Sequence, residues 1–362
     1  MKKKKKGGNT MEDRLRPNWF DREAGALRIV DQTLLPGEVQ YKELKTAEEV
    51  WTAIRILQVR GAPAIGVAAA YGAWLGAREK NPQSPQELER ALGETCAYLK
   101  TSRPTAVNLA WALSRMEKCL AACPHEWDVS AQLDALLQEA DSILQEDEEQ
   151  NLCIARHGLS LLQPGMGLLT HCNAGELATS RWGTALGPIL LGQQEGYGFH
   201  VYADETRPLL QGARLTAFEL CRAGVDVTLQ CDNMAASLMA AGKIQAVLVG
   251  CDRVARNGDT ANKIGTLSLA VLARHYGIPF YVLGPTSTVD LSCESGKDIP
   301  IEERPGEEIT SLWYRQPMAP QGVKTYNPAF DVTPAPLISA IITEKGVARA
   351  PFTDTLTAMV QG

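Results

Sequence analysis

Two short polar segments, each closing an apolar run, hold the side chains best suited to chemistry. Residues 167–175 contain Cys172, and residues 246–253 contain Asp252. Each preceding run has the length of a buried strand, so both side chains stand where a strand is expected to end. In an open parallel sheet the carboxyl ends of the strands line the ligand crevice. A thiol and a carboxyl group at two such ends therefore predict one shared active site.

Each of these two residues also has an ordinary structural interpretation. Most cysteines are inert small apolar residues, and Asp252 could simply pair with Arg253 or Arg256. In the catalytic interpretation, the apolar strand before Asp252 raises the pKa of its carboxyl group by desolvation and makes it a proton donor near neutrality. His171 neighbours Cys172 on an extended strand, so it should point to the opposite face, and we expect no Cys–His pair.

A candidate anion site follows from small residues at a helix start. Arg60, Gly61 and Ala62 stand immediately before or within the first turn of a helix that Pro63 begins. The free N–H groups of a helix N-terminus and an adjacent guanidinium group can bind a phosphate. The alternative is a helix start packed into the core with Arg60 in solvent.

Two further segments could contribute to the same anion site. Arg103 precedes Pro104, which we place in the first turn of a helix over residues 105–120, and it could equally be a surface arginine. Asn262 and Lys263 end what we interpret as a flexible loop before a helix over residues 266–276. Residues 203–216, which include Gln211, follow an expected strand and are rich in polar groups, as ligand-binding loops are.

The composition of the chain limits the function classes. The 362 residues carry a net charge of −6, which argues against a nucleic-acid or membrane surface as the main partner. The longest apolar run, residues 62–77, is too short for a membrane span. Nine cysteines without any Cys-x-x-Cys spacing indicate neither a disulfide framework nor a zinc site, and they favour a reducing cytoplasm. The lysine run at residues 2–6 is interpreted as a disordered tail.

The periodicity of the chain predicts which elements position these side chains. Residues 27–35 and 39–44 alternate like two half-exposed strands, and residues 46–149 have helical periodicity. Strands are expected at residues 167–172, 199–203, 225–230, 246–250 and 279–283, with helices between them. We therefore predict an α/β protein: a partly disordered lead-in (1–26), a smaller, mainly helical domain with a β element (27–150), and a Rossmann-like parallel sheet domain (151–362). The glycine-rich signature of nucleotide cofactors is missing from the sequence.

Taken together, five ordered segments resemble one known family. They are residues 60–66, 170–175, 205–216, 250–266 and 327–334, and the resemblance extends from about residue 27 to residue 347. The chain is similar to the 5-methylthioribose-1-phosphate isomerase family, whose fold is shared with ribose-1,5-bisphosphate isomerases and with regulatory subunits of the eukaryotic initiation-factor guanine-nucleotide exchange factor.

The resemblance implies a function and a set of site residues. It implies a cytoplasmic homodimer that isomerises a sugar phosphate in methionine salvage, with no required metal or cofactor. The catalytic residues of the family correspond to Cys172 and Asp252. Its substrate-binding residues correspond to Arg60, Gly61, Ala62, Arg103, Gln211, Asn262 and Lys263. Two alternatives stay open: an isomerase for ribose 1,5-bisphosphate or 5-deoxyribose 1-phosphate, and a non-catalytic regulatory subunit.

Overall fold

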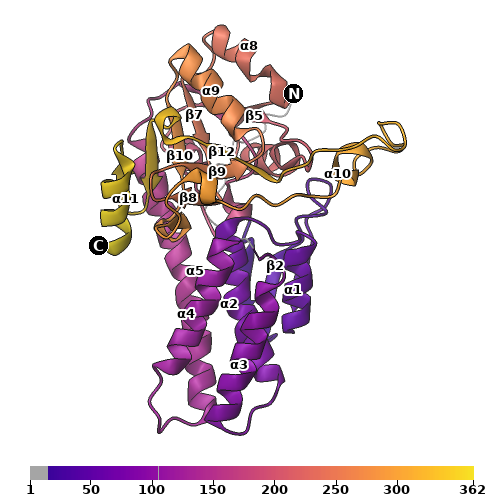
Figure 1. Ribbon diagram of the computed structural model, residues 1–362, viewed down its shortest axis with the longest axis vertical. Helices are drawn as coiled ribbons and strands as arrows, with labels where there is room; N and C mark the ends of the chain where they lie inside the picture. The colour runs from indigo at the N-terminus through magenta and orange to yellow at the C-terminus, as the bar shows by residue number, and fades with distance from the viewer. Residues whose placement is uncertain (1–14, 105) are drawn as a thin grey trace, which may run out of the picture.

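The computed structural model describes residues 15–104 and 106–362. Helices of the first half form an elongated bundle, and the second half forms a sheet region at one end of it (Figure 1). This arrangement confirms the predicted α/β class with a helical N-terminal part. The lysine run at residues 2–6 and the first residue of the helix expected at 105–120 lie outside the described residues.

The described residues of the N-terminal part form a small antiparallel sheet and five helices. The sheet has the order β1 (Asn18–Asp21), β2 (Ala26–Val30), β3 (Tyr41–Leu44), and β1 was not predicted. The helices are α1 (Ala47–Arg55), α2 (Ala62–Glu79), α3 (Pro85–Lys100), α4 (Val107–Ala121) and α5 (Val129–Leu159). Pro104 therefore lies before α4, whose cap is Ala106, and the prediction that this proline occupies the first helical turn is wrong.

Helix α2 lies at the centre of the bundle because it is apolar on every side. All its residues from Ala64 to Ala77 are buried, as expected for a helix without a polar face. Gly76 lets its neighbours approach closely, since a Cβ at this position would lie 2.5 Å from the Thr95 side chain and 2.8 Å from that of Ala47. This contact holds the C-terminal part of α2 against α1 and α3, while the start of α2 lines the cavity at the sheet region.

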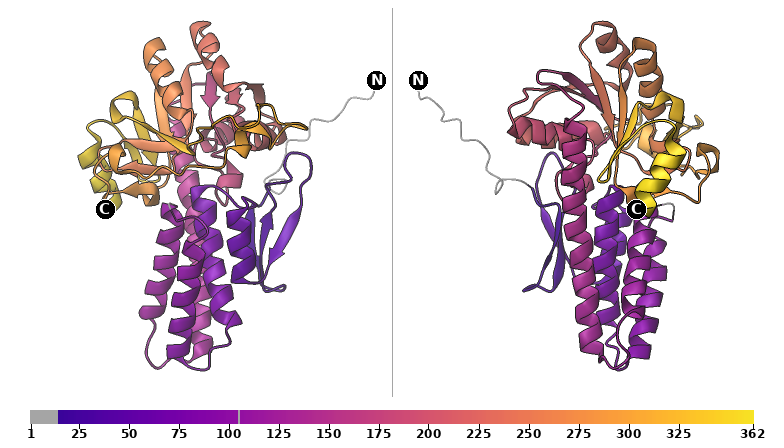
Figure 2. Two further views of the ribbon diagram at one scale, coloured as in Figure 1. Left: turned by 45° about the vertical axis from the view of Figure 1, so that its right-hand side comes forward. Right: turned by 90° about the vertical axis from the view of Figure 1, so that its left-hand side faces the viewer.

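Helix α5 joins the two parts of the molecule. Its 31 residues run from the far end of the bundle into the sheet region, where it packs beside α6 (Gly187–Gln194), and both views in Figure 2 show it passing between the two parts. The division of the chain at residues 150 and 151 falls inside this helix and stays a prediction.

The C-terminal part is built on a seven-stranded sheet. The strands are β4 (Gly167–Thr170), β5 (His200–Asp204), β6 (Asp226–Gln230), β7 (Ala246–Val249), β10 (Phe280–Leu283), β13 (Ala340–Thr343) and β14 (Gly346–Ala348). Their order is β14-β13-β10-β7-β4-β5-β6, and all neighbours are parallel except β13 and β14. Numbered along the chain, the six parallel strands have the order 3-2-1-4-5-6 of a Rossmann fold. The five strands predicted from the sequence are thus confirmed, each within two residues.

A second sheet of short strands lies beside the first and was not predicted. Its order is β11 (Val289–Asp290), β8 (Arg253–Ala255), β9 (Thr260–Lys263), β12 (Phe330–Thr333). The remaining helices of this part are α7 (Ala217–Arg222), α8 (Ala235–Ala240), α9 (Thr266–Tyr276), α10 (Glu307–Thr310) and α11 (Phe352–Gln361). Among the residues that the structure describes, no helix combines the length and apolar character that a membrane span requires.

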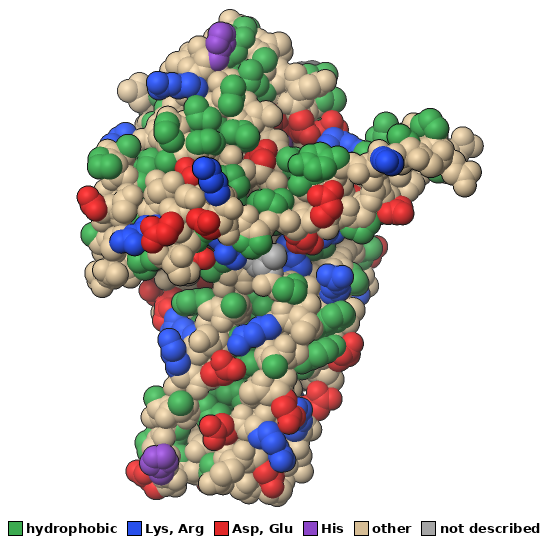
Figure 3. All heavy atoms as spheres, in the orientation of Figure 1, with side chains coloured by type: hydrophobic (Ala, Val, Ile, Leu, Met, Phe, Trp, Pro, Cys, Tyr) green, Lys and Arg blue, Asp and Glu red, His purple; other side chains and the backbone are tan. Residues whose placement is uncertain are grey.

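An arm that carries α10 projects from the sheet region. It spans the chain between β11 and β12, and in Figure 3 hydrophobic side chains gather toward its outer end. Exposed large apolar residues of this arm include Leu312, Trp313, Met318 and Tyr326.

Candidate active site

The order of the strands opens a crevice between β4 and β7. The chain leaves β4 toward β5 on one side and leaves β7 toward β10 on the other, so the connections diverge at this point. A cavity lies there, between the sheet region and the N-terminus of α2. It is lined by all nine residues that the sequence predicted: Arg60, Gly61, Ala62, Arg103, Cys172, Gln211, Asp252, Asn262 and Lys263.

Cys172 is held in an unusual backbone conformation. Its φ of 63° lies in the left-handed region, which non-glycine residues seldom adopt and which stores strain at functional sites. Its N–H donates to Thr206 Oγ1 at 2.8 Å, and its carbonyl oxygen accepts from Thr216 Oγ1 at 2.6 Å. These two threonines fix the direction in which the thiol leaves the end of β4.

Cys172 is half-buried and lines the cavity. Burial raises its pKa, while the positive charges of Arg60 and Lys263 act in the opposite direction. Both ring nitrogens of the adjacent His171 face other partners, Asp204 and the carbonyl of Ile264, so His171 is not a base for Cys172. The expectation that there is no Cys–His pair is confirmed.

Asp252 enters the cavity from the segment after β7. Burial raises the pKa of its carboxyl group above the ordinary value, and the charges of Lys263, Arg103 and Arg60 oppose that rise. The arginines considered as its partners bind elsewhere: Arg253 donates to Asp290 and Arg256 to Glu294. A carboxyl group in this environment can keep its proton closer to neutral pH than an exposed one, as a general acid must.

The start of α2, where the sequence predicted an anion site, lines the cavity. No side-chain hydrogen bond caps this helix, and Gly61, Ala62 and Pro63 at its start line the cavity. Gly61 has a φ of 97°, and a Cβ there would lie 2.4 Å from the Ala178 carbonyl oxygen, which makes glycine necessary at this point. Arg60 donates to Asn173 Oδ1 at 2.9 Å and to the Asn173 carbonyl oxygen at 2.6 Å. It is therefore a fixed group rather than one in solvent.

The orientation of Asn173 depends on a buried glutamate that the sequence did not single out. Glu219 accepts from Asn173 Nδ2 at 2.9 Å and from the N–H groups of Glu176 and Leu177. Burial raises the pKa of Glu219 to about 7. Through Asn173, this carboxyl group orients Arg60 at the cavity wall.

Asn262 and Lys263 belong to strand β9, so the interpretation of this segment as a flexible loop is wrong. Asn262 Nδ2 donates to Thr266 Oγ1 at 3.0 Å, and Lys263 Nζ donates to the Ala329 carbonyl oxygen at 2.9 Å. Lys263 is only 8% exposed, and its Nζ lies 4.8 Å from the Phe330 ring centroid. Burial lowers the pKa of this ammonium group, which makes it a strong partner for an anion that neutralises it.

Two arginines face each other across a shared carboxylate at the edge of the cavity. Arg103 donates to Glu302 Oε2 at 3.3 Å, and Arg304 donates to Glu302 Oε1 at 2.9 Å and also to Glu308. Arg304 lines the cavity but lies in no motif, so the sequence analysis missed it.

Two buried polar atoms of predicted site residues have no partner in the structure: Arg103 Nε and Gln211 Oε1. Gln211 is 6% exposed and lines the cavity, so a ligand hydroxyl group would satisfy this oxygen.

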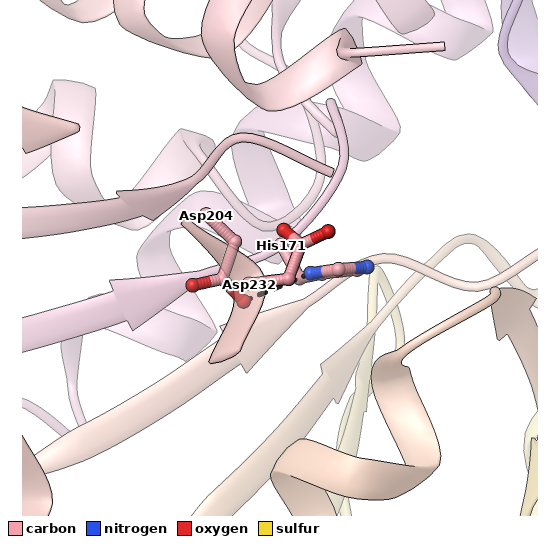
Figure 4. A group of neighbouring side chains, drawn as sticks. All are labelled: His171, Asp204 and Asp232. Atoms are coloured by element: carbon pink, nitrogen blue, oxygen red, sulfur yellow. Dashed lines mark hydrogen bonds and ion pairs between the residues drawn. The ribbon is translucent and has the colours of Figure 1, made fainter. Parts of the chain in front are cut away.

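His171, Asp204 and Asp232 form a group whose atoms lie within 4.8 Å of one another (Figure 4). Their hydrogen bonds argue against a metal ion there. Asp232 accepts from the N–H groups of Thr206 and Arg207, and Asp204 accepts from Gln230 Nε2. Because the ligand atoms are already engaged with donors, the group fits a structural network better than a metal centre.

The chain is similar to several known proteins. Residues 58–350 match the initiation factor 2 subunit family. A methylthioribose-1-phosphate isomerase of Symbiobacterium thermophilum is 59% identical over 96% of both chains, and a 5-deoxyribose 1-phosphate isomerase of Petrotoga mobilis is 57% identical over 91% of this chain and 94% of its own. The crystal structure of 5-methylthioribose 1-phosphate isomerase from Pyrococcus horikoshii superposes with a TM-score of 0.88 at 41% identity, covering 98% of each chain.

Proposed function

The chain belongs to the initiation factor 2 subunit family, and on that premise we propose that it is an aldose–ketose isomerase that converts 5-methylthioribose 1-phosphate to 5-methylthioribulose 1-phosphate. The observation that carries the proposal is the single cavity in which Cys172 and Asp252 face the same space as Arg60 and Lys263. A proton donor and a thiol beside a phosphate site are the groups that this reaction requires.

The first step is the opening of the sugar ring. The phosphate on the anomeric oxygen prevents the spontaneous opening that a free sugar undergoes, so the ring oxygen must receive a proton while its bond to C1 breaks. Asp252 supplies this proton because burial keeps its carboxyl group protonated at higher pH. The helix start, Arg60 and Lys263 hold the phosphate meanwhile.

The second step moves a hydrogen from C2 to C1 and leaves a ketone at C2. In one route Cys172 removes the C2 hydrogen as a proton, and an enediol-type intermediate is then protonated at C1. In the other route the hydrogen moves as a hydride while the C2 hydroxyl group gives its proton to the Asp252 carboxylate left by the first step, and Cys172 only stabilises the transition state. The raised pKa of Cys172 favours the second route, since a thiolate is disfavoured there.

A second candidate substrate is 5-deoxyribose 1-phosphate, after the name of the Petrotoga mobilis relative. The two sugars differ only in the substituent at C5, and apolar residues that line the cavity, among them Leu57 and Leu209, are compatible with either. A regulatory subunit without activity would not require Cys172 and Asp252 to share a cavity with an anion site.

The test is direct. The purified protein is incubated with each sugar 1-phosphate, and the ketose is followed by NMR with the ratio kcat/KM as the measure of preference. Loss of the proposed function would be seen as no ketose from either sugar. Running the reaction in heavy water separates the two routes, because only the proton route incorporates deuterium at C1.

We also propose a homodimer in the cytoplasm, and light scattering on the purified chain tests the dimer.

A further inference from the structure

We propose that His171 is a positioning residue of this active site, which ties the strand end that carries Cys172 to the segment that carries Lys263. The inference rests on the proposed function for its kinetic readout. His171 forms no pair with Cys172, and the proposed mechanism gives its ring no role.

The ring of His171 bridges two separate segments. It is 1% exposed, its Nδ1 lies 2.9 Å from Asp204 Oδ2 at the end of β5, and its Nε2 lies 2.9 Å from the Ile264 carbonyl oxygen. Figure 4 shows the ring extending away from the two carboxyl groups, so its far nitrogen is free to reach a third segment. Ile264 directly follows Lys263, the buried cation of the anion site.

The partners of the ring fix where its hydrogens are. A carbonyl oxygen only accepts, so Nε2 must carry a hydrogen and donate it to Ile264. Asp204 and Asp232 lie on the other side, and the charge of a third acidic group, Asp331, also interacts with His171. Burial alone would lower the pKa of His171, but its hydrogen bond with Asp204 leaves that pKa raised. Both nitrogens are thus suited to donate.

The turn after β9 is pressed against the ring. Gly265 has a φ of 105°, and a Cβ there would lie 2.9 Å from His171 Cε1, so only glycine allows this approach. The Gly265 N–H group donates to Asp331 Oδ2 at 2.8 Å. The ring is therefore enclosed by backbone on one side and by the carboxyl groups on the other.

This arrangement has a consequence for the substrate site. Without a donor at the position of Nε2, the half-buried Ile264 carbonyl group would lose this hydrogen bond, and the segment would shift toward an arrangement that supplies another partner. The adjacent Lys263 and Asn262 would move with it, while Cys172 lies on the other segment. The distance between the phosphate-binding cation and the thiol then changes, which weakens binding and misplaces the reacting carbons.

Two substitutions separate the two hydrogen bonds of the ring. In His171→Asn the amide nitrogen stands near the position of Nδ1, so it keeps a donor for Asp204 and loses the one for Ile264. In His171→Gln the longer side chain carries its amide nitrogen toward the position of Nε2 and restores a donor for Ile264. His200 provides the matched control, since it also pairs with an aspartate, Asp226, but at the exposed edge of the sheet.

We expect His171→Asn to raise both KM for the sugar phosphate and Kd for inorganic phosphate, measured by calorimetry, at least tenfold. His171→Gln should bring both values back to within about threefold of wild type, and His200→Asn and His200→Gln should change neither. Equal constants for wild type and His171→Asn, or equal losses in the Asn and Gln variants, would overturn the inference. The phosphate Kd is independent of turnover. If the wild-type protein showed no isomerase activity, the proposed function would be refuted, and the phosphate Kd values would still test the positioning role of His171.

Discussion

Replacing Lys263 by methionine is expected to weaken anion binding and to stabilise the free protein at the same time. Lys263 Nζ has three N–H groups, and one of them donates to the Ala329 carbonyl oxygen at 2.9 Å. Two are left for the phosphate. A hydrogen bond to a charged group contributes about 1.5–3 kcal/mol, so the loss of one such bond corresponds to a rise of roughly 10- to 150-fold in Kd.

The gain in stability follows from the direction of the pKa shift. Burial lowers the pKa of Lys263 below its ordinary value of 10.5, so the folded state disfavours the ammonium form. This cost is fully present below the pKa of the folded state and disappears as the pH rises toward 10.5. Methionine keeps an apolar stem against Phe330 and carries no charge. The Ala329 carbonyl oxygen still accepts from the Ile264 N–H group at 3.1 Å, so it is not left without a partner.

The assay combines calorimetry with inorganic phosphate and thermal unfolding at pH 7 and pH 10. Lys263→Met should have a weaker phosphate affinity and a higher Tm than wild type at pH 7, with the Tm difference smaller at pH 10. The control is Lys80→Met, because Lys80 forms a surface ion pair with Glu94 far from the cavity. A phosphate Kd within twofold of wild type, or a lower Tm at pH 7, would refute the assignment of Lys263 as a buried, anion-binding cation.

Three further predictions concern the cavity. Cys172→Ala and Asp252→Asn should each lower kcat by about 10²- to 10⁴-fold with phosphate affinity unchanged, and a variant within about tenfold of wild-type kcat removes that residue from the mechanism. Since burial raises the pKa of Asp252, wild-type kcat should fall on the alkaline side of the pH profile. The stability of Asp252→Asn relative to wild type should increase with pH up to the folded-state pKa of Asp252 and then level off. Urea unfolding measured across this pH range would contradict the raised pKa if the relative stability of Asp252→Asn fell with pH. Gly61→Ala should destabilise the protein by about 1–3 kcal/mol and weaken phosphate binding, because the added Cβ would lie 2.4 Å from the Ala178 carbonyl oxygen. The control is Gly93→Ala in helix α3, where an added Cβ meets nothing within 4 Å. This variant should stabilise the protein by about 0.5–1 kcal/mol in the same unfolding assay.

The parts of the site that the sequence predicted are those at the ends of strongly apolar strands. Strands β4 and β7 are buried on both faces, so they appear in the sequence as continuous apolar runs whose ends are easy to locate. Cys172 and Asp252 follow within two or three residues of Thr170 and Val249, where those strands end. That β7 lies next to β4, with β5 on the other side, depends on crossover connections and could be expected only from the resemblance to a known family.

Strand β9 shows why the local structure around two correctly named residues was predicted wrongly. Its four residues are all buried, yet Asn262 and Lys263 are polar, and their side chains are satisfied by Thr266 and by the Ala329 carbonyl group. Hydropathy alone therefore indicates a loop. Arg304 was missed for a similar reason: Glu302 and Glu308 neutralise it, and nothing in its local sequence distinguishes this group from a surface ion pair.

The cavity is closed by contacts between residues that are distant along the chain. Arg60 and Asn173 are 113 positions apart, and Arg103 and Glu302 are 199 positions apart. During synthesis the helical bundle can form early, but Arg103 can pair with Glu302 only after almost two hundred further residues have been synthesised. Contacts of such high sequence separation form late because loop closure must come first. The recovery of enzymatic turnover after dilution from denaturant should accordingly lag behind the recovery of helical circular dichroism, so activity reports on the last folding event.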